Sequence, residues 1–426
     1  MLFRQIRIPE GRGTTAADVL IQNGSIAAVS SERLDVPAGT RIYDGQDKLL
    51  LPGLVNAHCH IPMTLLRSRG HGLNLQRWLT EAIFPFEAKM TANDMRIGTK
   101  LGLLEMIAGG VTSFSDMYMY IVDIADECLN AGIRANLCYG IGSGDEPFEN
   151  RRGVQETLAL LDWVQKDNRA DYITVDAGLH AEYTSDEETV RAVAAFAAEH
   201  NLSVHTHLSE TRFEHEQSLE RHGMTPLAWF EHCGLLHNKT QVAHAVHISA
   251  DDIALMQTRN VVPVHCPGSN LKLGSGIADI PAWQAAGLPF AVGTDGAASN
   301  NNLNQLEELH LASMIQKGYR FDPLQLDVEA LMSAAFENGY RVQGRAGGQI
   351  LPDLPADLFV LDLDRPHLIP ADDPLALLFH SAQASDVCLT MAAGKILYEN
   401  GEFKTLDAER IKAESAQAVK SLLARI

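Results

Sequence analysis

Two histidines separated by a single residue, His58 and His60, end a short apolar run that starts at Leu49. Side chains alternate along a β-strand, so both imidazoles would lie on one side of the strand end. Two imidazoles placed in this way can bind one metal ion, and imidazole suits zinc, iron, nickel or copper. An isolated pair is more often a pair of hydrogen-bonded core histidines, so other residues have to favour the metal site over that interpretation.

The same pattern recurs later in the chain, each time after an apolar run typical of a buried strand. His205 and His207 are again one residue apart, and Glu210 follows His207 by three residues. Further polar residues follow such runs at His180, His244, His247, His265 and Asp295. Taken singly, each has an ordinary explanation, such as a helix N-cap for Asp295. Together they predict a metal site whose ligands are carried by the ends of several strands.

A repeated alternation of strands and helices would bring these residues together. From residue 49 onward we identify eight strand candidates, which end at Asn56–His60, Thr112–Met117, Leu137–Ile141, Asp176–His180, Val204–Leu208, Val242–His247, Val262–Cys266 and Ala291–Asp295. Helical periodicity lies between most of them, most clearly at Met95–Ala108, Gly153–Val164 and Asp186–His200, and Asn302–Lys317 follows the last strand. This pattern predicts an α/β fold, a (β/α)8 TIM-like barrel, which carries its chemistry at the C-terminal strand ends.

Short strands also precede and follow the predicted barrel. Asp18–Ile21 and Ser25–Val29 flank an Asn-Gly turn, while Ala356–Asp362 and a hairpin at Val387–Tyr398 come after the barrel. Strand sets this small cannot bury themselves alone, so we expect both termini to form one small β-sandwich domain. The predicted domains are residues 1–50 (first part of the β-sandwich), 51–347 (barrel) and 348–426 (second part of the β-sandwich and a terminal helix from about Leu406).

Composition limits the class of partner. The 426 residues include 54 acidic and 34 basic side chains, which gives a net charge of −20 at pH 7. This excess of acidic groups disfavours nucleic acid or an anionic membrane as a partner, because both require a basic surface. We find no signal-peptide pattern and no apolar run of ~18 residues, and the six scattered cysteines indicate free thiols. We therefore expect a cytoplasmic protein that acts on a small-molecule substrate.

Motifs around these polar residues resemble those of one known family. LPGLVNAHCH, VHTHLSE, VAHAVH and VGTDGAASNN are similar to motifs of the amidohydrolase superfamily. IPMTLLRSRG, FPFEAKMT, LHAEYTS and HCPGSNLKLGSGIA narrow the resemblance to the 5-methylthioadenosine/S-adenosylhomocysteine deaminases. The resemblance extends over nearly the whole chain, from the N-terminal strands to Met391–Lys395.

This resemblance implies one divalent metal ion per subunit, usually zinc, bound by His58, His60, His207 and Asp295. The catalytic residues that it implies are Glu210, which would transfer a proton, His244, which would hydrogen-bond the attacking water, and Asp295, which would accept a proton. Two-metal members of the superfamily use a modified lysine at the end of strand four. That strand end, Thr174–His180, contains no lysine, so one metal ion is expected.

The resemblance also implies contacts to the substrate. Glu87 would bind the ribose hydroxyls, and His180, Glu210 and Asp295 would also contact the substrate. The family uses two arginines for the carboxylate of the homocysteine tail, but one of these positions matches Tyr139 here. The other falls near Arg151-Arg152, and we take Arg152 as the candidate contact. Lid and specificity loops are expected at residues 71–78 and 142–152.

The expected activity is hydrolytic deamination of an adenosine derivative, which yields the inosine analogue and ammonia. Candidate substrates are 5-methylthioadenosine, S-adenosylhomocysteine, 5'-deoxyadenosine and adenosine, and the resemblance implies a homo-oligomer. The alternatives are deamination of guanine, a pterin or cytosine, and triazine hydrolysis. A binding protein without activity is disfavoured because all four ligand positions and Glu210 are present. The other zinc deaminase design, with combined HxE and PCxxC motifs, is absent from the sequence.

Overall fold

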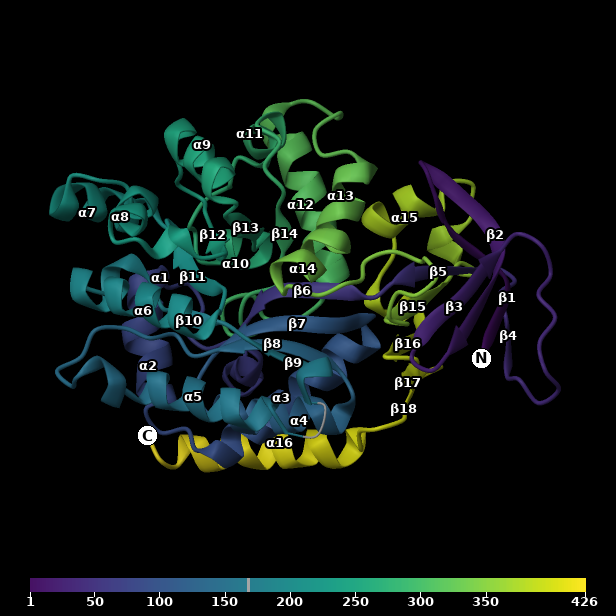
Figure 1. The fold of residues 1–426 in the computed structure, drawn as a ribbon, viewed down its shortest axis with the longest axis horizontal. Helices are drawn as coiled ribbons and strands as arrows, with labels where there is room; N and C mark the ends of the chain where they lie inside the picture. Colours follow the sequence, from purple (N-terminus) through teal and green to yellow (C-terminus); the bar gives the residue numbers. More distant parts are fainter. Residues whose placement is uncertain (167–168) are drawn as a thin grey trace.

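A barrel of parallel strands, surrounded by helices, forms the centre of the computed structural model, which describes residues 1–166 and 169–426 (Figure 1). Its strands are β6 (Leu54–Cys59), β7 (Val111–Met117), β8 (Arg134–Cys138), β9 (Ile173–Val175), β10 (Ala177–Leu179), β11 (Val204–Leu208), β12 (Thr240–His244), β13 (Val262–His265) and β14 (Ala291–Val292). Because β9 and β10 are two halves of one strand interrupted at Asp176, these segments fill eight positions. The predicted (β/α)8 barrel is confirmed.

Two parallel sheets make up the barrel wall, with the orders β6-β7-β8-β9 and β10-β11-β12-β13-β14. A parallel bridge between Ile141 and Leu179 joins them on one side. On the other side the backbone N–H of Asp295 donates to the carbonyl of His58 at 3.0 Å. The closure therefore brings the end of the last strand directly beside the first pair of histidines.

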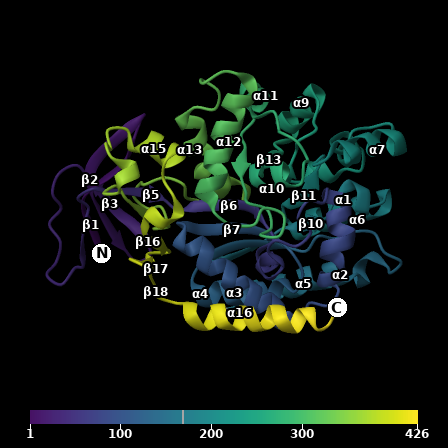
Figure 2. The same ribbon diagram turned by 180° about the vertical axis from the view of Figure 1, so that it is seen from behind.

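Twelve helices of the described chain follow these strands and surround the barrel (Figures 1 and 2). They are α3 (Ala92–Ala108), α4 (Ile121–Ala131), α5 (Arg152–Val164), α6 (Glu187–His200), α7 (Arg212–His222), α8 (Pro226–His232), α9 (Ala250–Arg259), α10 (Pro267–Lys272), α11 (Ile280–Ala285), α12 (Gln305–Arg320), α13 (Val328–Ala335) and α14 (Glu337–Val342). Side-chain caps determine several starts, since Thr91 and Ser249 form capping boxes. Helix α12 begins later than predicted because Asn304 caps it by accepting from the N–H of Glu307.

The chain segment between β6 and α3 contributes to the mouth of the barrel. It contains a 3-10 helix (Ile61–Leu66), α1 (Leu75–Arg77), a π-helical turn (Trp78–Ile83) and α2 (Phe84–Glu87). The indole N–H of Trp78 donates to the carbonyl of Arg69 at 3.1 Å and anchors the turn. The sequence predicted a lid loop at residues 71–78, and the structure shows that the second half of this segment is helical.

Both termini form one β domain, as predicted. Its strands are β1 (Leu2–Glu10), β2 (Gly13–Gln22), β3 (Ser25–Ser30), β4 (Ile42–Asp44), β5 (Lys48–Pro52), β15 (Leu358–Asp362), β16 (Val387–Ala392), β17 (Lys395–Glu399) and β18 (Glu402–Phe403). They pair in the order β18-β17-β16-β15-β5-β1-β2-β3, with β4 beside β1. The sheet curls back on itself, because the N–H of Ile26 donates to Leu354 and that of Ala356 to Gly24, both at 2.9 Å.

The chain passes from the β domain to the barrel at Gly53, between β5 and β6. A side chain there would overlap Thr112, because a Cβ atom at Gly53 would lie 1.9 Å from its Oγ1. Glycine is therefore required because the side chain of Thr112 packs directly against the backbone at this position. The domain limits at residues 50/51 and 347/348 stay predictions.

The C-terminal helix α16 (Ala408–Leu423) returns from the β domain and runs along the barrel beside α3 (Figures 1 and 2). Arg425 then forms two hydrogen bonds with the buried carboxylate of Asp94, at 2.8 and 2.9 Å. The short helix α15 (Pro374–His380) packs against α12 and α13. Among the described helices, none combines the length and apolar composition needed to cross a lipid bilayer.

A buried ion pair also joins the barrel to the β domain. The Nε of Arg134 on β8 donates to Asp357 at 2.7 Å, and the same carboxylate accepts from the N–H of Ala393 at 2.6 Å. Both side chains are almost fully buried, at 11% and 2% exposure. Desolvation of such a pair is compensated only while both partners are present.

Replacement of Asp357 by alanine is therefore expected to destabilise the protein by about 3–5 kcal/mol, because Arg134 would remain buried without its partner. Chemical denaturation would measure this loss. Asp364→Ala, at an exposed position of the same domain, serves as the control and should cost less than about 0.5 kcal/mol. Equal effects of the two substitutions would contradict the structural role of the ion pair.

Candidate active site

A cavity of about 220 Å³ opens at the C-terminal ends of the barrel strands. Its polar wall consists of His60, His180, His207, Glu210, His244 and Asp295. Its other wall is mainly apolar and comes from Met63, Leu75, Trp78, Leu79, Ile83 and Phe84, with Glu87 at the end of this segment. Met117–Met119, Tyr139, Gly140 and Tyr183 complete the lining. Among the described residues, neither lysine nor arginine lines the cavity.

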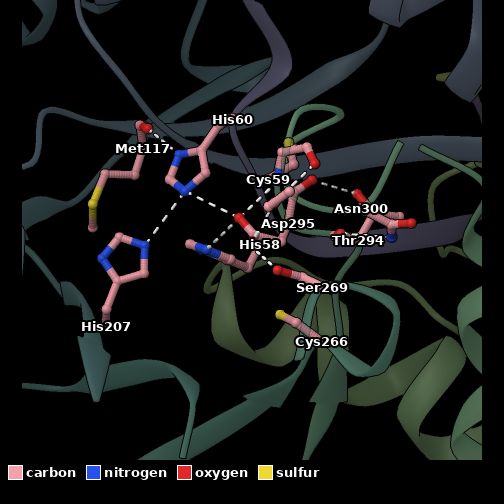
Figure 3. A network of polar contacts seen from close by, with 12 residues as sticks. His58, Cys59, His60, Met117, His207, Cys266, Ser269, Thr294, Asp295 and Asn300 are labelled. Atoms are coloured by element: carbon pink, nitrogen blue, oxygen red, sulfur yellow. Dashed lines mark hydrogen bonds and ion pairs between the residues drawn. The ribbon is translucent and has the colours of Figure 1, made fainter. Parts of the chain in front are cut away.

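The two histidines of β6 are directed to the same point. The Nδ1 of His60 donates to the carbonyl of Met117 at 2.6 Å, which leaves its Nε2 to face Asp295 at 3.2 Å (Figure 3). His58 is fully buried, and its Nδ1 lies 2.8 Å from the Nε2 of His205. Its Nε2 lies 3.6 Å from Asp295 and has no hydrogen-bond partner within the described chain. In both residues a partner at Nδ1 orients the ring.

His207 on β11 and His244 at the end of β12 are oriented in the same way. The Nδ1 of His207 donates to the carbonyl of His180 at 2.7 Å, and its Nε2 lies 3.4 Å from that of His60. The Nδ1 of His244 lies 2.9 Å from the amide oxygen of Asn270, to which it donates. Each Nε2 therefore remains available as a lone-pair donor toward the cavity.

Asp295 follows β14 and has a left-handed backbone, with φ of 60°. Its Oδ2 accepts from the hydroxyls of Ser269 at 2.5 Å and Ser299 at 2.8 Å, and its Oδ1 accepts from the N–H of Gly296 at 2.7 Å. Figure 3 shows the carboxylate of Asp295 directed toward His60. The three donors fix the carboxylate and preserve its negative charge.

Glu210 lies beside His244 in the same cavity. One of its oxygens lies 3.6 Å from the Nε2 of His244, and the other accepts from the hydroxyl of Ser275 at 3.2 Å. Burial raises the pKa of the Glu210 carboxyl, although the charge of His244 acts in the opposite direction. A carboxyl group whose pKa is raised in this way is suited to hold and deliver a proton.

The histidines near Asp295 differ in the direction in which their pKa is shifted. Burial lowers the pKa of His58 to about 4 and that of His180 to about 4. Burial also opposes protonation of His60, but the hydrogen bond and charge of Asp295 outweigh it and raise the pKa of His60 to about 9. Burial acts to raise the pKa of Asp295 as well, but its interactions with the neighbouring imidazoles of His58 and His60 hold that pKa well below the usual range.

These donors fit a divalent metal ion. Ligand atoms of His58, His60 and Asp295 all lie within 4.8 Å of one another, and so do those of His58, His207 and His244. Both groups share His58, so they describe one site. The unpartnered Nε2 of His58 is a buried lone pair that a cation would satisfy. Imidazole nitrogens with one carboxylate oxygen are a donor set that zinc accepts.

Some of the predicted substrate contacts line the cavity, and one does not. Glu87 lines the cavity and accepts from the hydroxyl of Tyr118 at 2.6 Å, and His180 lines it beside Tyr183. Tyr139 lines the cavity as well. Arg152 is not among the lining residues: its guanidinium lies 4.1 Å from the centre of the Tyr120 ring and donates to Glu156 at 2.7 Å.

Arg151 is also not among the residues that line the cavity. Its guanidinium donates to the carbonyls of Gly142 and Gly144 at 3.3 Å and to Thr189 at 2.8 Å. These bonds connect the ends of segment 142–152, which the sequence predicted to be a specificity loop, and tie it to α6.

Several residues at the site were not predicted. Tyr118, Asn270 and the two serines that hold Asp295 all follow β7, β13 or β14 at the same end of the barrel. The rule that identified the histidines, polar residues just after a strand, would have found Tyr118 if applied to the second strand. Asn270 and the serines are too ordinary in type to be distinguished in a sequence.

The geometry predicts that His58→Ala and Asp295→Ala each lose bound metal, because each removes a ligand atom from the cluster. Elemental analysis of protein purified with zinc would measure the metal content. His232→Ala, at a distant position on α8 whose side chain is 51% exposed, is the matched control and should retain the wild-type content. Full zinc content in both site variants would rule out this cluster as the metal site.

Comparisons with known proteins agree with the geometry. The model of the amidohydrolase family matches residues 49–397. A 5-methylthioadenosine/S-adenosylhomocysteine deaminase of Acetivibrio thermocellus is 39% identical over 388 residues, which cover 90% of this chain and 89% of that protein. A 5'-deoxyadenosine deaminase of Methanothermobacter thermautotrophicus is 37% identical over 423 residues, which cover 98% and 97% of the two chains.

Among solved structures, an adenosine deaminase from Xanthomonas campestris with bound zinc is similar over 99% of this chain and 98% of its own, with a TM-score of 0.92 and 30% identity. The similarity therefore includes the β domain and the C-terminal helix as well as the barrel. Because the family model and these relatives each span most of the sequence, the protein belongs to the amidohydrolase family.

Proposed function

We propose that this hydrolase removes the exocyclic amine of an adenosine derivative and releases the inosine analogue and ammonia. The main support for the proposal is a single cavity that contains carboxylates at two separate places. Glu210 and Asp295 lie next to the histidine cluster, whereas Glu87 enters from the segment before α3. The first set suits chemistry on a purine ring, and Glu87 suits a pair of ribose hydroxyls. Relatives named as adenosine-type deaminases support the same substrate class.

The proposal includes one divalent ion per subunit, zinc, held by His58, His60, His207 and Asp295. When bound, such an ion lowers the pKa of a water molecule from 15.7 to about 7 and supplies a nucleophile at neutral pH. Asn270 sets the tautomer of His244, so that the Nε2 of this residue is free to hydrogen-bond and orient the attacking water.

Proton transfer is assigned to two carboxyl groups. Attack at the amine-bearing ring carbon requires a proton on the neighbouring ring nitrogen, and Glu210 is placed to deliver it because burial favours its protonated form. Asp295 accepts one proton of the attacking water at its carboxylate and passes it to the departing amino group, which leaves as ammonia, and the second proton of that water restores Glu210. The hydroxyls of Ser269 and Ser299 keep this carboxylate in position during both transfers.

The remaining walls bind and enclose the substrate. Glu87 is held by Tyr118 and would accept from the ribose hydroxyls, and His180 would contact the substrate next to it. The apolar side chains from residues 75–84 would cover the nucleoside and exclude bulk water. Arg152 stays a predicted contact that would require its guanidinium to leave the Tyr120 ring.

Glu210→Gln is expected to retain metal but to reduce kcat by about 10²–10⁴-fold, because the amide has the same shape but cannot deliver a proton. Spectrophotometric assays and elemental analysis on the same preparation would check both statements. Glu220→Gln, an exposed change on α7, is the matched control and should leave kcat unchanged. Turnover near the wild-type rate in Glu210→Gln would exclude the proton-transfer role.

Substrate preference provides a second test. We expect faster turnover of 5-methylthioadenosine, 5'-deoxyadenosine and adenosine than of S-adenosylhomocysteine. The reason is that the cavity lining includes acidic side chains but, among the described residues, no lysine or arginine to pair with the carboxylate of the homocysteine tail. The absorbance change from adenine to hypoxanthine would give kcat/KM for each compound.

Guanine, cytosine and a chlorotriazine complete the substrate panel. Preference for S-adenosylhomocysteine would assign its carboxylate to Arg151, Arg152 or another group, and loss of that preference in Arg152→Ala would identify Arg152. Turnover of the free bases or the triazine without any adenosine would refute the ribose role of Glu87 and favour the alternative activities.

A further inference from the structure

The short connection from β11 to α7 carries Glu210 and is held by a second buried carboxylate, that of Glu214. The side chain belongs to the first turn of α7 and is only 1% exposed. Glu214 is not among the residues that line the cavity, so it is not placed to contact the substrate. The reaction described above does not use this residue.

Glu214 binds two successive backbone groups. Its Oε1 accepts from the N–H of Ser209 at 2.9 Å, and its Oε2 accepts from the N–H of Glu210 at 2.8 Å. The backbone of Ser209 has a left-handed φ of 43°, a conformation that non-glycine residues rarely adopt. The fork of two hydrogen bonds therefore stabilises an unfavourable backbone turn just before the residue assigned to proton transfer.

This turn decides where the Glu210 side chain can reach. The Glu210 carboxyl must lie between His244 and the hydroxyl of Ser275, at 3.6 and 3.2 Å. Its own backbone N–H is one of the two groups that Glu214 holds. Rotation of the turn would move the carboxyl away from both neighbours, whereas the proposed ligands His58, His60 and Asp295 lie on other segments and His207 lies within β11.

Helix capping alone does not explain this arrangement. Thr211 already caps α7 by accepting from the N–H of Glu214 at 3.2 Å. The Glu214 carboxylate instead reaches backward beyond the cap to residues 209 and 210, which precede the helix. Burial and the nearby charge of Glu210 raise the pKa of Glu214 against the effect of its two backbone hydrogen bonds, so the ionised form that accepts both bonds is kept here at a cost in free energy.

We propose that Glu214 is a positioning residue for proton transfer: its carboxylate holds the 209–210 turn so that Glu210 faces the reacting ring. This inference rests on the proposed role of Glu210. Glu214→Gln keeps the size of the side chain, but its amide nitrogen would meet a backbone N–H and lose one of the two hydrogen bonds.

A double-mutant cycle would test the inference. Glu214→Gln in the wild-type background should reduce kcat by up to about 100-fold, the cost of a displaced catalytic group, with KM and zinc content nearly unchanged. In the Glu210→Gln background the same substitution should change kcat by less than about 2-fold, because the group that it positions is already inactive. A purely structural role would reduce kcat equally in both backgrounds and would overturn the proposal.

The matched control is Glu216→Gln, two residues further along α7, where the same chemical change is made on an exposed side chain. This variant should retain wild-type kcat in both backgrounds. A loss of activity in Glu216→Gln equal to that in Glu214→Gln would show that α7 is generally sensitive to loss of charge, and it would also overturn the proposal.

A readout without turnover separates this inference from the proposed function. Hydrogen–deuterium exchange of a peptide covering residues 205–214 should be faster in Glu214→Gln, because the amides of Ser209 and Glu210 lose an acceptor. Unchanged exchange would refute the positioning role whatever the substrate is. The cycle itself uses whichever compound of the panel the wild-type protein converts, so failure of the adenosine assignment does not affect it.

Discussion

The convergence of four imidazoles and one carboxylate on a single buried point is the constraint on which this structure depends. His58, His60, His207, His244 and Asp295 come from four different strand ends and direct ligand atoms into one small volume. Burial of so many polar atoms costs free energy unless each finds a partner, and the Nε2 of His58 finds none in the described chain. A divalent cation would satisfy these lone pairs together, which explains how such a cluster can be maintained in the centre of a barrel.

The helices outside the barrel fix the loops that carry this cluster. Glu308 on α12 accepts from the N–H of Gly268 at 2.8 Å and from the side chain of Asn300 at 2.7 Å, and thereby links the loops after β13 and β14. Glu105 on α3 accepts from the N–H of Leu303 at 2.8 Å. Glu214 holds the loop after β11 in the same way, by accepting from two backbone N–H groups. A carboxylate that accepts backbone N–H groups forms short, strong bonds, so a few helix residues can define the geometry of distant loops.

The sequence predicted most of the fold because its signals are local. Apolar runs followed by histidine or aspartate located the barrel strands, and the Asn-Gly turn located the hairpin of β2 and β3. The segment at residues 75–87 was harder, since its three short helical pieces lack a continuous period. The sequence also did not show that Tyr139 lines the cavity whereas Arg152 does not. The direction of a side chain after a strand depends on what packs around it.

The sequence alone determined the types and spacing of the candidate ligands and the alternation that places His58 and His60 on one side of a strand. It also determined that both termini share a domain, because neither set of strands could be buried separately. His205 and His207 are two residues apart and so lie on the same side of β11. Only the tertiary structure decided that His205 contacts the Nδ1 of His58, whereas His207 lines the cavity. It also decided that Glu214 holds the turn before Glu210. These facts depend on distances of a few ångströms between side chains and neighbouring segments, which spacing along a chain does not specify.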